Sequence, residues 1–459
     1  MIGQLVRIGN SVITSMNSCV LRNFVLPIGD LLFGQKMISR LKFLERVQWW
    51  NPEQITVKQS EELKNLVQIA YNEVPFYRNM MKIHNIDPVK INSAQDLQQF
   101  PVVNKTILKS GYPDLTVRNT GRRTYEARTS GSTGENFAVR EDLFTAGWYR
   151  ATLLLTLEWA GWSIGLPHVQ TGMTLQRSLD RKLKDWILGC HYVSAYNLDD
   201  IHLTQMLEII EKQKIKFIWG YPGSLYHLAL YAIKTGWNIP LISAVTWGDM
   251  LYPQYRLAIE QAFKTKVFDT YGCAEGFHIA GQCGVGDHYH IHDLDVIVEI
   301  LDDNDCPVKP GTPGHVVVTR LHPGPMPLIR YRVGDIAYSQ EGYCECGRGF
   351  SLLGGIQGRD TDIVITPEGN RLIVHFFTGI LEHFPEIESF QVIQENKEDL
   401  LLRIVPGGQT DPLLSNRINN ALKEKGTGSL NIKIDFVNDI PLTTAGKRRF
   451  VISKLINKD

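Results

Sequence analysis

The sequence predicts an α/β protein in two parts. A large N-terminal domain, residues 1–358, would carry parallel-rich sheets flanked by helices, and a small mobile α+β domain would span residues 359–459. Three observations support this division. Helical spacing dominates residues 1–110, short apolar strands alternate with helices in the middle of the chain, and paired strands follow Gly358.

Two patterns predict that the N-terminal part is helical: a strong apolar periodicity and a helix cap. The face of a helix that ends near Pro75 is expected to comprise Val57, Leu63, Leu66, Val67 and Ala70. Ser93 with Asp96 three residues on predicts a capping box.

The first 21 residues allow two interpretations. Apolar residues at helical spacing are Leu5, Ile8, Val12, Met16 and Val20. Their helix could pack on its own domain or lie on a membrane surface. Interspersed polar residues argue against a signal peptide, and no run reaches the ~18 apolar residues of a membrane span. The expected location is cytoplasmic, with peripheral contact at the inner membrane surface as the alternative.

The middle of the chain predicts a β-α-β-α-β unit with a parallel sheet. The expected strands are residues 215–219, 241–247 and 267–270. One expected helix begins with Ser224 as its cap, and the other spans residues 253–263. Each strand ends in a glycine-bearing loop, at Gly220, Gly248 and Gly272. Ligands of open α/β sheets bind beyond the carboxyl ends of strands, so these glycines are expected to border one pocket.

The C-terminal pattern predicts a compact α+β unit. Residues 390–394 and 400–405 form a strand pair, and Asp411 and Pro412 open a helix that Gly426 closes. A half-buried strand follows, with Leu430, Ile432, Ile434 and Phe436 alternating.

Composition excludes several classes of protein. Lys plus Arg and Asp plus Glu are both 48, which argues against a protein that coats nucleic acid. Hydrophobic residues at 43% exclude a mainly disordered chain, and seven cysteines in 459 residues are too few for a disulfide scaffold.

Five short motifs carry candidate chemistry. The first, Thr129, Ser130, Gly131, Ser132, Thr133 and Gly134, lies between two β-like stretches, 124–128 and 137–140. Its backbone N–H groups and hydroxyls could cradle phosphates, or the segment could be a plain turn. It is no Walker A loop, because no lysine follows the second glycine.

The other four motifs lie further along the chain, at residues 271–275, 331–335, 358–362 and 444–448. In the second, an aromatic ring could cover a purine and Glu275 could hold magnesium. In the third, the carboxylate of Asp335 could grip the vicinal hydroxyls of a ribose.

Together, in this order, the motifs resemble the adenylate-forming superfamily of acyl-CoA synthetases. Within it the chain looks most like the phenylacetate–CoA ligase and capsule-biosynthesis (CapK-like) branch, whose signatures are similar to residues 70–78, 100–105 and 220–222. The resemblance covers essentially the whole chain and implies the fold of adenylate-forming enzymes.

The resemblance implies an ATP-dependent ligase. Such enzymes join a carboxylate to ATP, release pyrophosphate and pass the acyl group to a thiol, usually of coenzyme A. By resemblance, Ser130 to Gly134 would hold the β- and γ-phosphates, with Thr129, Gly248, Asp249 and Gly272 also at the nucleotide. Tyr271 would cover adenine, Asp335 and Arg359 would bind the ribose, and Glu275 would hold Mg²⁺. Lys447 would act at the α-phosphate as the catalytic cation.

The chain departs from the family pattern at four points. Asn136 stands where proline is usual, Ala274 replaces the threonine before the motif glutamate, and Thr361 occupies the acidic hinge position, with Asp362 following. Gly248-Asp249 replaces Gly-Glu. The acid itself is therefore left open. Trp219, Tyr221, Trp247, Phe277 and His278 are proposed to line an aromatic-acid pocket.

A structural zinc site is also expected. One residue separates Cys344 from Cys346, and upstream lie Cys283, His288 and His290. Zinc prefers four Cys or His ligands, and the resemblance favours His290 over His288 because an isoleucine follows it. The alternative is a turn with reduced cysteines.

Three functions follow in order of preference. The first is an acyl-CoA synthetase acting on a small carboxylic acid. The second passes the acyl group to a carrier protein, an amine or a glycan in capsule polysaccharide biosynthesis. The third is a weakly active scaffold, which the substitutions at Ala274, Thr361 and Asn136 motivate. No nucleic-acid partner is expected, and the oligomeric state is left open.

Overall fold

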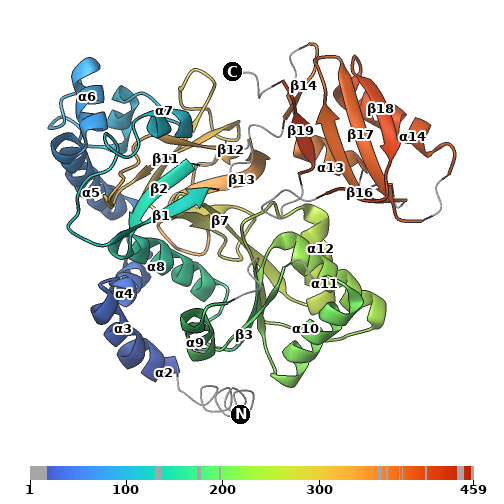
Figure 1. The fold of residues 1–459 in the computed structure, drawn as a ribbon, viewed down its shortest axis with the longest axis horizontal. Coiled ribbons are helices and arrows are strands. Elements are labelled where there is room, and N and C mark those ends of the chain that lie inside the picture. Colours follow the sequence, from blue (N-terminus) through green and yellow to red (C-terminus); the bar gives the residue numbers. More distant parts are fainter. Residues whose placement is uncertain are drawn as a thin grey trace.

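The computed structural model describes residues 18–129, 137–172, 177–195, 198–359, 363–368, 371–381, 383–384, 386–408, 411–441 and 449–455. An eleven-stranded mixed sheet dominates this part of the chain, with the order β10-β11-β12-β13-β9-β8-β7-β6-β5-β3-β4. Figure 1 shows helices on both sides of it and a separate C-terminal unit. The predicted α/β class is confirmed.

Helices precede the sheet, as expected. They are α2 (Ser18–Val20), a π-helical turn (Leu21–Val25), α3 (Leu26–Phe33), α4 (Met37–Val47), α5 (Pro52–Glu73), α6 (Pro75–Ile83), a 3₁₀ turn (Ala94–Gln99) and α7 (Lys105–Ser110). The capping box of Ser93 and Asp96 forms at the 3₁₀ turn. The predicted apolar face of α5 is right except for Val57, which is exposed because it lies two residues after the buried Ile55 and so on the other side of the helix.

The last three strands of the parallel half of the sheet follow the predicted β-α-β-α-β order, and its first two strands were not predicted. The parallel half comprises β3 (His168–Gly172), β4 (Cys190–Ser194), β5 (Phe217–Gly220), β6 (Ser243–Thr246) and the first half of β7 (Lys266–Cys273), all paired in parallel. The helices between them are α9 (Leu179–Ile187), α10 (Asp200–Lys212), α11 (Pro222–Thr235) and α12 (Pro253–Phe263).

One predicted cap is wrong. Helix α11 begins at Pro222, with Tyr221 as its N-cap residue, because proline suits the first helical position. Ser224 therefore lies inside the helix, where its buried hydroxyl donates to the carbonyl of Ala195.

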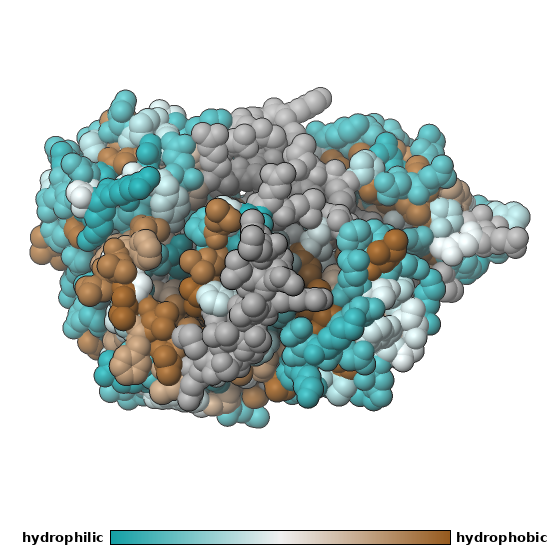
Figure 2. All heavy atoms as spheres, turned by 60° about the horizontal axis from the view of Figure 1, so that its bottom comes forward, coloured by the Kyte–Doolittle hydropathy of each residue, from teal (hydrophilic) through white to brown (hydrophobic). Residues whose placement is uncertain are grey.

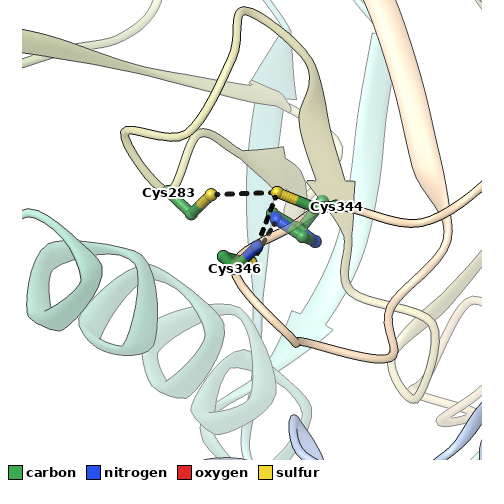
Figure 3. A group of neighbouring side chains, drawn as sticks. Cys283, Cys344 and Cys346 are labelled. Carbon is green, nitrogen blue, oxygen red and sulfur yellow. Dashed lines mark hydrogen bonds between the residues drawn. The ribbon is translucent and has the colours of Figure 1, made fainter.

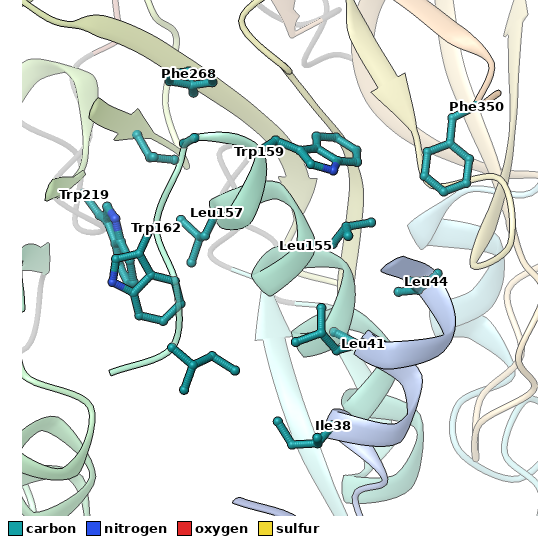
Figure 4. Packing of buried hydrophobic residues seen from close by; sticks show 14 of the residues in the cluster. Ile38, Leu41, Leu44, Leu155, Leu157, Trp159, Trp162, Trp219, Phe268 and Phe350 are labelled. Atoms are coloured by element: carbon teal, nitrogen blue, oxygen red, sulfur yellow. The ribbon is translucent and has the colours of Figure 1, made fainter. Parts of the chain in front are cut away.

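Alternate residues of the parallel strands face two different cores. Ile218 and Ala244 face α10–α12, whereas Trp219, Val245 and Phe268 face α4 and α8 (Leu143–Trp159). Figure 4 shows Trp219 beside Trp162, and Leu155 of α8 beside Leu41 of α4. Burial on both faces explains why these strands read as continuous apolar runs.

The antiparallel half of the sheet carries the motifs nearest the site. It comprises β8 (Phe277–Gly281), β9 (Tyr289–Ile291), β10 (Val296–Leu301), β11 (Pro313–Arg320), β12 (Tyr331–Ser339) and β13 (Leu352–Arg359). A separate hairpin pairs β1 (Thr124–Thr129) with β2 (Phe137–Asp142), as predicted.

The C-terminal unit has its own four-stranded sheet, β18-β17-β16-β19. Its elements are β14 (Ile363–Ile365), β15 (Arg371–Ile373), α13 (Val374–Leu381), β16 (Ile387–Gln394), β17 (Asp399–Pro406), α14 (Leu414–Leu422), a π-helical turn (Lys423–Thr427), β18 (Asn431–Phe436) and β19 (Val451–Ser453). The predicted strand pair is confirmed as an antiparallel hairpin.

The predicted helix from Asp411 to Gly426 is too long at both ends. Asp411 instead holds the turn before α14, where its carboxylate accepts from the N–H of Leu413. After Leu422 the backbone widens into a π turn, and Gly426 lies inside that turn with a φ of 140°. Among the described residues, no helix has the length and apolar character to cross a bilayer.

Candidate functional site

Two tyrosine–carboxylate pairs lie where β7 leaves the parallel half of the sheet. Tyr271, near the end of β7, donates its hydroxyl to Oδ2 of Asp335 on β12 at 2.8 Å. Tyr331, at the start of β12, donates to Oε1 of Glu275 at 2.8 Å. Two motifs about 60 residues apart in the sequence are therefore joined at one site.

Burial keeps both phenols protonated and donating. Burial, followed by the charge of the nearby Asp335, raises the pKa of Tyr271 well above its usual value. Burial and the charge of Glu275 do the same to the pKa of Tyr331. The carboxylates therefore accept hydrogen bonds from fixed donors, which orients them for a ligand.

The turn between β7 and β8 requires glycine. A Cβ on Gly272 would lie 2.5 Å from the carbonyl oxygen of Phe277, and Gly276 has a φ of +91°. This tight turn brings Glu275 back under Tyr331. The glycines are therefore part of how the sequence positions the carboxylate.

Arg359 lies opposite Asp335 on the neighbouring strand. The two residues are direct partners in the β12–β13 register. The backbone thus places both candidate ribose ligands at the same level of the sheet.

The glycine-bearing loops after β5 and β6 meet at the same edge. The N–H of Trp247 donates to the carbonyl of Gly220, and a Cβ built on Gly248 would lie 2.9 Å from the ring of Tyr221. Asp249 is exposed after β6, and its Oδ1 accepts from the N–H of Met250. The expected neighbourhood of these loops is therefore present.

Several predicted residues lie outside the described residues: Ser130, Gly131, Ser132, Thr133 and Gly134 of the phosphate loop, Thr361 at the hinge, and Lys447. The backbone of Thr129 and Phe137, which flank the loop, is paired across the β1–β2 hairpin.

The proposed aromatic pocket is divided between two cores. Trp219 stacks on His168 with ring centroids 3.7 Å apart, and Trp247 lies 6.1 Å from Trp219. Phe277 packs in a different core, and its neighbour His278 faces the opposite side of β8, near Tyr149 of α8. Phe277 therefore lies apart from Trp219 and Trp247.

A group of metal-ligating side chains lies between the β8–β9 connection and the β12–β13 connection. The ligand atoms of Cys283, His290, Cys344 and Cys346 all lie within 4.8 Å of one another. Sγ of Cys283 is 3.7 Å from Sγ of Cys344, and Sγ of Cys346 is 3.4 Å from Nε2 of His290 (Figure 3). His290, not His288, belongs to this group.

Two of the four side chains favour their metal-binding forms, whereas burial raises the pKa of Cys283 to about 12 and that of Cys344 above its usual value. Burial, with help from nearby Arg348 and His288, lowers the pKa of His290 to about 4, so its imidazole is neutral at pH 7. Burial opposes ionisation of Cys346, but hydrogen bonds from Arg348 and the neighbouring cysteines outweigh it, and the pKa of this thiol is lowered. Neutral imidazole and thiolate are the forms that bind zinc.

Comparison with known proteins shows what the chain resembles. A family model described as the CapK C-terminal domain matches residues 364–454. Phenylacetate-coenzyme A ligase of Thermus thermophilus is 27% identical over 366 residues, 76% of this chain and 80% of that protein. Protein CapK of Staphylococcus aureus is 22% identical over 457 residues, 94% of this chain and 99% of the relative.

Solved structures share the fold. A 2-hydroxyisobutyryl-CoA ligase in the postadenylation state superposes with a TM-score of 0.70 at 20% identity, over 87% of this chain and 90% of that one. The chain is thus similar to adenylate-forming ligases over most of its length, and its C-terminal unit is similar to that of CapK. The resemblance predicted from the sequence is thereby confirmed.

Sequence reasoning missed the contacts of several buried polar residues in or next to the antiparallel half of the sheet. Tyr331 was part of a motif, but its role as the donor to Glu275 depends on a contact across 56 residues. Asp269 on β7 accepts from Tyr289 on β9, and burial raises its pKa to about 6. His292 is buried beside Thr156 and His278. Isolated polar residues inside apolar strands were the available signal for these positions.

Proposed function

We propose that this ligase activates a carboxylic acid with ATP as an acyl-adenylate and transfers the acyl group to the thiol of coenzyme A. The observation that carries the proposal is the hydrogen bond from Tyr271 to Asp335, which joins the adenine and ribose motifs into one site. Relatives named phenylacetate-coenzyme A ligase support the reaction class.

The residues divide the work of binding the nucleotide. Tyr271 covers the adenine, while Asp335 accepts from the ribose hydroxyls and Arg359 supports the same end of the nucleotide. Thr129, the loop 130–134 and the exposed loop at Gly248 and Asp249 surround the phosphates. Fixed donors and charges of this kind cost no reorganisation during reaction.

Glu275 fits a magnesium ion. Mg²⁺ prefers carboxylate oxygens, and Tyr331 holds one oxygen of Glu275 in place. A bound Mg²⁺ would neutralise phosphate charge. Lys447 supplies a further positive charge as the acid's carboxylate attacks the α-phosphorus and pyrophosphate leaves.

The C-terminal unit, residues 359–459, acts as a lid in this proposal. The reaction needs different groups at one site for adenylation and for thiol transfer, so the unit turns about the segment at Thr361 between the two steps.

Cys283, His290, Cys344 and Cys346 are proposed to bind one structural zinc ion. Four Cys and His ligands match the preference of Zn²⁺, and a full set of four protein ligands is typical of structural rather than catalytic zinc sites. The ion would tie together two connections about 60 residues apart in the sequence.

One finding favours an acyl acceptor other than coenzyme A. Protein CapK covers nearly the full length of this chain, and its family model matches the C-terminal unit that would meet the acceptor. The alternative is therefore adenylation followed by transfer to a carrier protein, an amine or a glycan, in a cytoplasmic step of capsule polysaccharide biosynthesis.

The deciding experiment measures pyrophosphate release across a panel of carboxylic acids, with and without coenzyme A. Acid-dependent release with an acyl-CoA product supports the first function, and release without that product supports the alternative acceptor. No release with any acid, from protein that binds ATP, would favour the scaffold function.

Two variants test the roles of the residues. Lys447→Ala should slow acyl-adenylate formation by roughly 100- to 1000-fold with little change in ATP affinity, because its charge acts in the transition state. Asp335→Ala should instead weaken ATP binding, and Asp114→Ala, at an exposed turn outside the site, is the matched control.

A further inference from the structure

The outward face of the first helices is apolar and solvent-exposed. Between Val20 and Gly34 the exposed large side chains are Val20, Phe24, Ile28, Leu31, Leu32 and Phe33. Leu31 is 83% exposed and Leu32 74%. The opposite face, with Leu21, Val25 and Leu26, packs on the core beneath α8. We name the outward set the α3 face.

The exposed apolar surface continues toward α9. Leu179 and Leu183, one turn apart on α9, are also exposed. Ser18 of α2 donates to the carbonyl of Ile164, and the same loop approaches Gly189 just after α9. Figure 2 shows a broad brown area on the side of the molecule where α3 lies, which is the lower side of Figure 1.

Exposed cations lie beside the α3 face. Among the described residues 18–44, Lys36 and Lys42 are exposed, whereas Arg40 is buried and Arg22 pairs with Glu45 and Glu158. Asp30 turns inward, where its carboxylate accepts from the N–H of Ile38. On α9, Arg181 and Lys182 are exposed beside the two leucines, together with one acid, Asp180.

An apolar helical face with a basic rim matches the interface of an anionic bilayer. Such helices bury their apolar side at the level of the lipid headgroups while lysine and arginine meet the phosphates. A second copy of the chain fits less well, because a two-fold contact would place this basic rim against itself. No described helix can cross a bilayer, so contact would be parallel to the surface.

We infer that the α3 face and the outer side of α9 dock the ligase on anionic membranes. This goes beyond the proposed reaction and is independent of it. The chemistry would then take place next to a lipid surface, where a lipid-linked acyl acceptor could be reached.

The test is co-sedimentation of the full chain with vesicles of phosphatidylcholine alone and of phosphatidylcholine with phosphatidylglycerol. The wild type should bind the anionic vesicles, and added salt should weaken the binding. Leu31→Glu/Leu32→Glu should reduce binding at least about tenfold, because it places two charges in the docking face. The matched control, Val57→Glu/Val89→Glu, alters two exposed apolar side chains outside the face and should bind as the wild type.

A second variant isolates the charges. Arg181→Gln/Lys182→Gln should lower binding to anionic vesicles by about fivefold per charge and leave the weak binding to phosphatidylcholine unchanged. Pyrophosphate release in solution should be the same for all variants, which separates lost docking from lost folding.

Three results would overturn the inference. The first is failure of the wild type to bind anionic vesicles. The second is full binding by Leu31→Glu/Leu32→Glu. The third is a wild type that does not bind vesicles but forms a dimer in sedimentation velocity, when Leu31→Glu/Leu32→Glu dissociates that dimer.

Discussion

At the scale of single residues, the site depends on carboxylates held by tyrosines. A phenol is a compact donor that can be buried, so it fixes Asp335 and Glu275 without adding a charge that would compete with the nucleotide. Replacing either tyrosine by phenylalanine would leave the ring packing in place and remove only the orienting hydrogen bond.

Asp293 offers a test of buried charge outside the site. Burial raises the pKa of this carboxyl to about 7, although the N–H of Ser351 donates to it at 2.6 Å. Its folded-state pKa lies above the unfolded value of about 4. The native protein therefore holds the proton more tightly between about pH 4 and pH 7, and stability is lost as pH rises through that window.

Asp293→Asn removes this titration while keeping an acceptor for Ser351. The variant should gain free energy of unfolding relative to the wild type as pH rises from about 4 to 7, by up to about 4 kcal/mol. Urea unfolding at several pH values measures the difference. A difference that is constant with pH would contradict the assigned pKa.

Residue-scale prediction from sequence succeeded where chemistry is local. Ser93 caps with Asp96 three residues away, and four cysteine and histidine residues could be grouped by type. It failed for Val57 and Ser224, whose positions depend on where a helix starts and which neighbour covers it.

At the scale of elements, close approach between helices is set by glycine. A Cβ on Gly147 of α8 would lie 2.0 Å from the carbonyl oxygen of Gln35, just before α4. A Cβ built on Gly223 of α11 would have no neighbouring atom within 4 Å. The two helical glycines therefore differ in surroundings and not in secondary structure.

Alanine at these two positions should have opposite effects. Gly147→Ala should destabilise the protein by about 1–3 kcal/mol, because α4 and α8 must move apart. Gly223→Ala should stabilise it by up to about 1 kcal/mol, because alanine loses less backbone entropy in a helix. Thermal and urea unfolding measure both, and equal effects would refute the packing argument.

The proposed zinc ion would also act at the scale of elements, because it would join two connections between strands. Purified protein should contain about one zinc per chain, and Cys344→Ser should lose it together with part of the stability. Cys306→Ser, at an exposed cysteine outside the cluster, should keep the metal. A folded, active protein without zinc would contradict the assignment.

Elements were predictable where apolar periodicity is strong. Strands β5, β6 and β7 and helix α12 followed from runs bounded by glycine and proline, whereas β3 and β4 were not predicted. The ends of α14 were not, because Asp411 can hold a turn as well as a helix cap and Gly426 can lie in a widened turn. The shared position of Tyr271 and Asp335 needed the fold, since register across β7, β8, β9, β13 and β12 is a long-range property.

At the scale of the whole molecule, the proposed function depends on where the C-terminal unit lies. The same 2-hydroxyisobutyryl-CoA ligase superposes with a TM-score of 0.70 in its postadenylation state and 0.54 in its thioesterification state. The arrangement of this chain is therefore closer to the former. Figure 1 shows α12 lying toward the C-terminal unit.

One aromatic contact holds this arrangement. Tyr252, the N-cap residue of α12, lies 4.8 Å from Phe450 between ring centroids and is buried in the core of the C-terminal unit. Phe450 follows the segment that contains Lys447.

Removing the contact should shift the balance between the two half-reactions. Burial of an aromatic ring and its edge-to-face pairing are together worth about 2–3 kcal/mol, so Tyr252→Ala should lower the population of this arrangement severalfold or more. Acyl-adenylate formation should then slow by about tenfold, while transfer from supplied acyl-adenylate to coenzyme A should be unchanged or faster. Phe436→Ala, at an exposed ring on β18, is the control and should leave both rates unchanged. Equal loss of both half-reactions in Tyr252→Ala would mean that the contact stabilises the fold without selecting the arrangement, and the proposed turning of the lid would lose its support.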